Sequence, residues 1–148
     1  MLTLNLPAFE YKIKKKDGKL FIWDIVRKKY IVLQPEEWVR QHFINYLVEI
    51  KKVPVSLISL EYGQNYNSLS KRCDIVVWDS ELKPLLLVEC KASHIAVNED
   101  VFFQANTYNS QLGVKFMVLS NGIVHHYFQK DVSKYVQIQD LPVYDKML

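Results

Sequence analysis

The stretch from Lys71 to Ala92 reads KRCDIVVWDSELKPLLLVECKA. It predicts two apolar strands joined by a polar loop, with charged side chains at Asp74, Glu89 and Lys91, where such strands are normally apolar. Successive side chains of a strand point to opposite faces of the sheet, so Glu89 and Lys91 share one face and Cys90 takes the other.

The loop between these strands predicts their register. Residues 79–84 are rich in Asp, Ser and Pro, which favour a turn, so we expect a hairpin that is symmetric about this loop. In that register Asp74 lies directly opposite Glu89, with Cβ atoms roughly 4.5–5.5 Å apart. Two carboxylates this close repel each other unless a positive charge lies between them, and a divalent cation is the usual one. The stretch therefore predicts a metal site.

Length and composition indicate an ordinary globular chain. Its 148 residues fit one domain (1–148), and 49% hydrophobic with 24% charged residues excludes a disordered protein. No Gly-rich phosphate-binding motif occurs among its four glycines, so no nucleotide-driven motor is expected. Lysine and arginine form short runs at 14–16, 27–29, 51–52 and 71–72, and the net charge is +3. Such runs suit a nucleic-acid backbone, although solvated turns explain each run equally well.

Cysteine content and apolar runs predict the compartment. Cys73 and Cys90 are too few for a disulfide framework or a zinc site, so we expect buried, reduced thiols in a cytoplasmic protein. The N-terminal residues lack the apolar core of a signal peptide, and no apolar run approaches about 20 residues. We therefore expect no contact with a membrane.

Hydrophobic periodicity predicts a mixed sheet flanked by helices, an α/β fold bordering on α+β, with an N-terminal β-hairpin. The expected elements are strands 8–13, 19–26 and 30–33, a helix 35–51, a strand 55–62, a polar loop 63–70, the hairpin above, a helix 99–112, and strands 114–119, 123–129 and 135–139. Pro35 and Asn98 are good helix starts, and Gly113 is a good helix end.

Two further signals lie in the first hairpin and the first helix. Asp17-Gly18 is a strong turn signal between the first two strands. In the helix, four apolar residues recur at helical spacing and predict its buried stripe: Val39, Phe43, Leu47 and Ile50.

Asp74 followed by Glu89-Cys90-Lys91 fits the pattern D-x(n)-E-x-K. In this pattern the sequence resembles the PD-(D/E)XK nuclease superfamily, and the resemblance implies a restriction-endonuclease-like fold. The leading hairpin, the segment Pro-Glu-Glu-Trp-Val-Arg at 35–40 and the Glu-Cys-Lys-Ala strand resemble, more narrowly, the N-terminal nuclease domain of type I restriction enzyme R (motor) subunits. That likeness covers about residues 10–130. Cys73 stands where the superfamily name has proline.

A second motif of the superfamily is Q-x-x-x-Y, which Gln104 and Tyr108 match on the second expected helix. Residues four apart share a helical face, so both side chains would project together. Taken alone, they would be a surface amide and a core aromatic. For the D…E-x-K pattern, the alternative is a solvated hairpin with a salt bridge from Lys91 to Glu89 or Asp74. Unpaired charges are costly in an apolar internal strand, which argues against this alternative.

The resemblance implies an Mg²⁺- or Mn²⁺-dependent DNA endonuclease, a hydrolase related to type I restriction-modification. Its expected catalytic residues are Asp74, Glu89, Lys91 and, on the first helix, Glu37. Hard cations prefer oxygen ligands, so Asp74, Glu89 and the backbone carbonyl of Cys90 form the expected metal set. Lys91 would position the attacking water or stabilise the developing charge.

The acidic position on the first helix has two alternatives. Glu36 is the neighbouring choice of register, and Glu37 by itself equally fits a glutamate that stabilises the helix dipole.

Four residues are expected to contact the nucleic acid: Gln104, Tyr108, Lys71 and Arg72. The alternative for Gln104 and Tyr108 is that they orient the metal ligands. Contacts of lysine and arginine with phosphates position the substrate without reading its sequence, so little sequence specificity is expected. The expected partners are DNA, a motor (helicase) or specificity subunit acting in trans, and a second copy in a homodimer. The alternative functions are a catalytically inactive nucleic-acid-binding or assembly module of the same fold, and an RNA-directed nuclease.

Overall fold

The computed structural model describes residues 1–66 and 69–148, without the side chains of 63–66, 69–73, 103–104 and 107–111. The elements are β1 (Ile13–Lys16), β2 (Lys19–Asp24), β3 (Lys29–Val32), α1 (Pro35–Glu49), a 3₁₀ turn (Val55–Leu57), β4 (Ile58–Tyr66), β5 (Leu69–Trp78), β6 (Pro84–Cys90), α2 (Glu99–Leu112), β7 (Phe116–Ser120), β8 (His125–Asp131), β9 (Lys134–Ile138) and α3 (Tyr144–Met147). The expected element order is confirmed.

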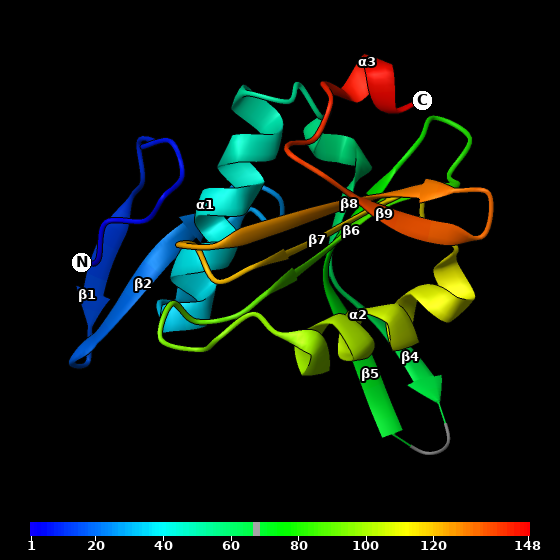
Figure 1. The fold of residues 1–148 in the computed structure, drawn as a ribbon. Helices are drawn as coiled ribbons and strands as arrows, with labels where there is room; N and C mark the ends of the chain where they lie inside the picture. The colour runs from blue at the N-terminus through cyan, green and yellow to red at the C-terminus, as the bar shows by residue number, and fades with distance from the viewer. Residues whose placement is uncertain (67–68) are drawn as a thin grey trace.

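The strands form two sheets (Figure 1). A small sheet has the order β1-β2-β3, and a large mixed sheet has the order β4-β5-β6-β7-β8-β9. Within the large sheet β6 and β7 pair in parallel, whereas the other neighbours are antiparallel. Because β6 has a neighbour on each side, it is internal, as its apolar sequence predicts. The predicted α/β fold with an N-terminal hairpin is confirmed.

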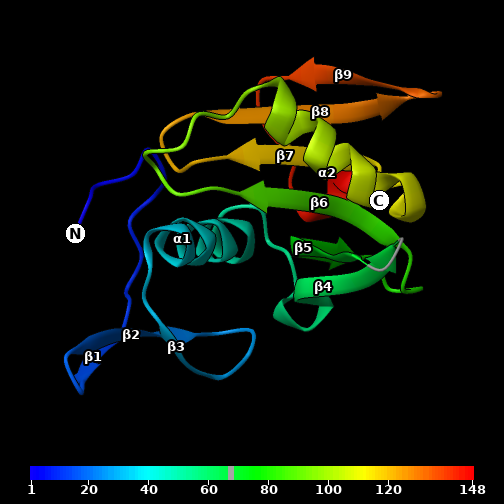
Figure 2. The ribbon, with the colours of Figure 1, turned by 90° about the horizontal axis from the view of Figure 1, so that it is seen from below.

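The helices bury two separate apolar clusters against the large sheet. One cluster joins α1 to alternate residues of the sheet such as Ile75, Leu86 and Val88, and the other joins α2 to Val76 and Leu87. This alternation is what a sheet with both faces covered requires. Figure 2 shows α2 crossing the large sheet and α1 lying beside the small sheet. In the described part of the chain, no helix is both long enough and apolar enough to span a membrane.

Local signals explain the start of the fold. Asp17 and Gly18 have φ of 51° and 76°, the positive values that a two-residue turn of a tight hairpin requires. The first strand runs from Ile13 to Lys16, so the predicted range 8–13 was wrong except for its last residue. On α1, Val39, Phe43 and Leu47 are fully buried as predicted. Ile50 lies just past the helix end and is 46% exposed, so its predicted burial was wrong.

The predicted polar loop at 63–70 was wrong. Strands β4 and β5 continue through most of it, pairing from Ile58↔Val77 to Tyr66↔Leu69. An extended hairpin satisfies its backbone groups through the ladder, so polar side chains do not prevent a strand there.

Helix α2 has the bounds that the sequence predicts. The side chain of Asn98 accepts hydrogen bonds from the backbone N–H groups of Asp100 and Val101, at 3.1 and 3.4 Å, and so caps α2. Gly113 follows the helix with a φ of 63°, the left-handed conformation that commonly ends a helix.

Candidate functional site

The register of the central hairpin sets Asp74 against Glu89. Ile75 pairs with Val88 and Val77 with Leu86, before a bulge shifts the ladder at Trp78. One step further along this antiparallel ladder, Asp74 and Glu89 are opposed as predicted, although the predicted symmetry of the loop was wrong: Trp78 pairs with Pro84, and the bulge produces the register. Both residues are nearly inaccessible to solvent, with exposed fractions of 8% and 3%.

Asp74 uses both carboxylate oxygens. Its Oδ2 accepts a hydrogen bond from the backbone N–H of Cys90 at 2.7 Å, and its Oδ1 accepts one from Nη2 of Arg40 at 2.9 Å. Burial raises the pKa of Asp74, while Arg40, the Cys90 N–H and Lys91 act in the opposite direction. Asp74 is thus tied both to the neighbouring strand and to helix α1.

Glu89 is less well satisfied. Its Oε1 lies 3.4 Å from Nζ of Lys91, while its Oε2 is buried and has no hydrogen-bond partner among the described residues. Burial raises the pKa of Glu89 to about 9, with a further contribution from the charge of Asp74 and an opposing one from Lys91. A buried acceptor without a donor is rare and costs free energy, so this oxygen is the natural place for a cation or a proton.

Arg40 supplies a positive charge to Asp74 from the side of α1. Its side chain is 6% exposed and donates from Nη1 to Oε1 of Glu37 at 3.0 Å as well as to Asp74. Burial opposes its charge, but the carboxylates of Asp74 and Glu37 hold its pKa above the usual range. The guanidinium therefore bridges an acidic residue of α1 to an acidic residue of β5.

Glu37 belongs to a buried polar network that reaches the small sheet. Besides Arg40, it accepts hydrogen bonds from Arg27 at 3.1 Å and Gln41 at 3.2 Å. Gln41 and Arg27 also donate to Oδ2 of Asp24, the last residue of β2, at 2.7 and 2.9 Å. Glu37 thus connects α1 to the small sheet.

Glu36 takes a different position from Glu37. Its side chain is 45% exposed, accepts a hydrogen bond from Arg40 at 3.3 Å, and lines a surface hollow together with Lys91. The same hollow is bordered by Asn98 and Val101 at the start of α2. Partial burial and the charge of Asp74 raise the pKa of Glu36. Of the two glutamates that the sequence leaves open, Glu36 faces this hollow beside Lys91.

The sequence interpretation gave no role to Arg40, Arg27, Gln41 or Asp24. A signal for Arg40 exists, because it follows Glu37 by three positions and Glu36 by four, the spacing of helical ion pairs. That spacing does not tell a buried pair from a surface pair.

Four expected nucleic-acid contacts lie outside the described side chains. Lys71 and Arg72 belong to β5, and Gln104 and Tyr108 belong to α2, which places them on the expected elements. The directions of their side chains stay predictions.

Part of the ligand set predicted for a metal ion is present among the described residues. Among the residues whose side chains are described, no cluster of three or more His, Cys, Asp or Glu residues is arranged to hold a metal ion. Two carboxylates, Asp74 and Glu89, are nevertheless opposed, and Oε2 of Glu89 lacks a donor. Hard oxygen donors of this kind fit Mg²⁺ or Mn²⁺ when a backbone carbonyl, such as that of Cys90, and water complete the shell.

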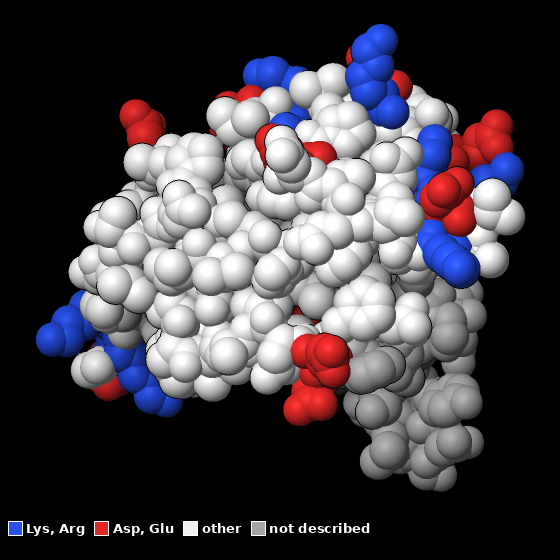
Figure 3. All heavy atoms as spheres, in the orientation of Figure 1, with Lys and Arg blue, Asp and Glu red and all other residues white. Residues whose placement is uncertain are grey.

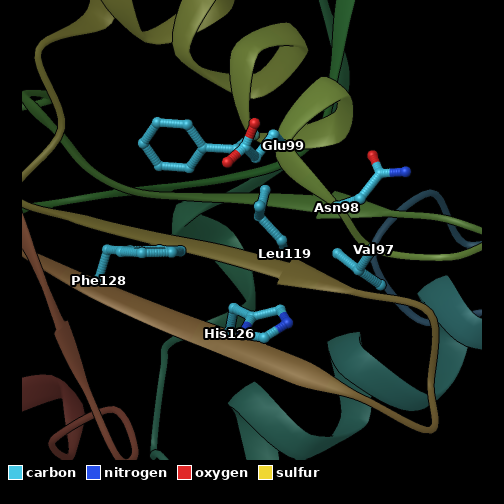
Figure 4. Close-up of a pocket in the computed structure, with 7 residues that line it drawn as sticks. Val97, Asn98, Glu99, Leu119, His126 and Phe128 are labelled. Atoms are coloured by element: carbon cyan, nitrogen blue, oxygen red, sulfur yellow. The ribbon is translucent and has the colours of Figure 1, made fainter.

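A separate apolar hollow lies across α2 and the β7–β8 pair (Figure 4). Val97, Asn98 and Glu99 border it from the start of α2, and Leu119 and Phe128 line it from the sheet. None of the expected catalytic residues lines it.

Comparisons with known proteins assign the chain to a family. The family model for the type I restriction enzyme R protein N terminus (HSDR_N) matches residues 35–142. A solved fragment from Vibrio vulnificus YJ016, assigned as an HsdR subunit of a type I restriction enzyme, is 24% identical with a TM-score of 0.47. The match covers 61% of this chain and 19% of that one. A search of curated proteins gave no match. Since the family match spans well over half of the sequence, the chain belongs to the family of type I restriction enzyme R protein N-terminal regions.

Proposed function

We propose that this chain is an Mg²⁺-dependent DNA endonuclease domain of the PD-(D/E)XK type. The observation that carries the proposal is the buried carboxylate of Glu89, which lies opposite Asp74. Its Oε1 lies near the ammonium group of Lys91, while its Oε2 has no donor among the described residues. Isolated buried carboxylates are costly, and they persist where a cation or a reaction uses them. Membership of a restriction-enzyme family is consistent with this activity.

The ligands of this proposal are the carboxylates of Asp74 and Glu89 and the backbone carbonyl of Cys90. When bound there, Mg²⁺ would neutralise the carboxylates and lower the pKa of a coordinated water. Arg40 donates to Oδ1 of Asp74, so a cation held by this carboxylate would lie next to the guanidinium.

Lys91 and the helix glutamates have separate roles in the proposed reaction. Lys91 is 21% exposed and opens into the hollow beside α2, where its ammonium group can contact a scissile phosphate. Its position holds positive charge at the point where negative charge develops during hydrolysis. Glu37 positions Arg40. Glu36, which lines the same hollow as Lys91, orients a water molecule or the Lys91 ammonium group.

The proposal extends to partners and compartment. Gln104, Tyr108, Lys71 and Arg72 contact the DNA backbone, and a motor or specificity subunit in trans, or a second copy, supplies the remaining functions of a restriction complex. Cys90 is a free, buried thiol, which suits the reducing cytoplasm.

A non-catalytic nucleic-acid-binding or assembly module is the second candidate. It is favoured by one observation: Arg40 already neutralises Asp74 and Glu37 within the chain. A fold that supplies its own cation can persist without a metal and without turnover.

Nicking of supercoiled plasmid DNA separates the two candidates. The endonuclease proposal expects nicking with Mg²⁺ or Mn²⁺, none with chelator, and a loss of at least about 100-fold in Lys91→Ala and Asp74→Asn. Lys83→Ala, in the exposed loop of the same hairpin, is the matched control and should cut like the parent. Absence of nicking with both cations, or nicking that Lys91→Ala leaves unchanged, supports the module instead. Parallel digests of RNA test the choice of substrate.

A further inference from the structure

The small sheet has one packed face and one open face. Ile13, Ile22 and Ile31 are opposed across the three strands, and Ile22 is fully buried against α1. Because strand side chains alternate, the residues between these isoleucines point away from the core.

The open face combines lysines with aromatic rings. Lys14 is opposite Phe21, and Trp23 is opposite Tyr30 in the same set of side chains. The Trp23 and Tyr30 rings meet edge to face with centroids 5.2 Å apart, and Nζ of Lys14 lies 4.1 Å from the Tyr30 centroid. All three rings are partly exposed to solvent.

Positive charge is concentrated at the β1–β2 end of the small sheet. Five lysines lie within eight residues: Lys12, Lys14, Lys15, Lys16 and Lys19. Lys16 and Lys19 are directly opposite each other, a like-charge pair that destabilises a hairpin. Figure 3 shows blue side chains gathered over β1 and β2 at the lower left, with other blue and red side chains along the top and right of the same view. A polyanion would relieve this repulsion.

The open face also borders the candidate site. A hollow lined by Phe21, Tyr30 and Val32 of the small sheet is bounded on its other side by Glu36 and Arg40 of α1. The open face therefore ends beside Glu36, the residue that also lines the separate hollow of Lys91.

We infer that the open face of the small sheet binds single-stranded nucleic acid. Lysines track the phosphates, and the aromatic rings stack on bases, which a duplex keeps covered by their neighbours. Lys14 leaves the Tyr30 ring for a phosphate, and so frees the ring for a base. This surface deepens the proposed function by adding an unpaired strand as a ligand bound beside the candidate site, and it rests on that function only for the choice of nucleic acid as the partner.

Binding of a fluorescent oligonucleotide to the full chain, with chelator and no divalent cation, tests this surface. The triple substitution Lys14/Lys16/Lys19→Ala should weaken binding at least about 10-fold and lower the slope of log affinity against log salt by about 2, since about 0.7 counterions are released per contact with a single strand. The control Lys83/Lys130/Lys134→Ala removes the same charge from the loop before β6 and from the ends of β8 and β9, and these elements lie away from β1 and β2 (Figure 1), so affinity should change little. Equal weakening by both triples would show unspecific attraction and overturn the inference.

The aromatic contribution has its own readout. Tyr30→Ala should weaken binding of single strands several-fold and Tyr30→Phe should restore it, while binding quenches tryptophan fluorescence in the parent and not in Trp23→Phe. Equal or tighter binding of a duplex, or binding of vesicles rich in anionic lipid that competes with the oligonucleotide, overturns the single-strand assignment. Because no metal is present, failure here leaves the plasmid-nicking result intact, and failure of nicking leaves this binding intact.

Discussion

Arg40 donates to Asp74 across 34 positions of sequence, with 2.9 Å between Nη2 and Oδ1. The bond joins helix α1 to strand β5 at the point where the hairpin brings Asp74 opposite Glu89. The charge balance of the candidate site is thus set by a residue of the helix as well as by the strands. Arg40 also binds Glu37, so one guanidinium serves two nearly buried carboxylates.

Replacing Arg40 by methionine should lower the free energy of unfolding by about 3–5 kcal/mol, because it leaves the buried Asp74 without its cationic hydrogen-bond partner. Urea denaturation measures this loss. The exposed Lys130→Met is the control, with an expected change within about 0.5 kcal/mol. In a double-mutant cycle, Asp74→Asn should recover part of the loss, and strictly additive effects would rule out the coupling inferred here.

The pKa of Glu89 predicts how stability depends on pH without divalent cations. Its pKa is about 9 in the folded protein against an ordinary 4.5, so the folded state holds an extra proton between these values. The free energy of unfolding should therefore fall as pH rises through this window, by at most about 1.4 kcal/mol per pH unit from this group.

Glu89→Gln removes that proton linkage. Urea denaturation at pH 5 to 8 with chelator should show the variant gaining on the parent as pH rises. Asp74 also has a raised pKa, so part of the pH dependence persists in the variant. Parallel pH curves for the two proteins would contradict the role given to Glu89.

Divalent cations should stabilise the protein by binding at Asp74 and Glu89. At pH 8, Mg²⁺ or Mn²⁺ is expected to raise the melting temperature, since a ligand that binds only the folded state adds stability by mass action. Asp74→Asn and Glu89→Gln should each abolish the rise, whereas Lys83→Ala should keep it. Arg40→Lys, which keeps one charge but loses the two-pronged contact, should bind the cation more tightly than the parent. A rise that persists in both carboxylate variants would place the cation elsewhere.

Two glycines with positive φ provide a matched test of packing. A Cβ on Gly122 (φ 85°) would lie 3.0 Å from both Leu4 methyl carbons and 3.1 Å from Val39, while one on Gly18 (φ 76°) would contact nothing within 4 Å. Both alanine variants lose about 1–2 kcal/mol from backbone strain. Gly122→Ala should lose a further 1–3 kcal/mol or so from overpacking, measured by urea denaturation. Equal losses would show that Leu4 moves aside freely.

The sequence predicts the opposition of Asp74 and Glu89 from a loop assumed to be symmetric, yet Trp78 pairs with Pro84, and only the bulge after Val77 produces the predicted register at Asp74. It also predicts α1 and α2, since Pro35 and Asn98 are specific start signals, but not the short α3. It does not predict that Arg40 is buried, because helical spacing is the same on the inner and outer faces and only packing against β5 distinguishes them. The sequence also does not predict which face of the small sheet is open, because alternation defines two faces and only the structure shows which one α1 covers.

β7, the parallel partner of β6, lies outside the part of the chain that contains the expected catalytic residues. Asp74, Glu89, Lys91 and the helix glutamates all precede residue 92, yet β7 (Phe116–Ser120) is what gives β6 its second neighbour. A fragment that ended after α2 would keep every expected catalytic residue and still present β6 as a bare, apolar sheet edge, open to pairing with other chains. A segment that contains every expected catalytic residue is therefore still too short to stay in solution unless it also includes β7.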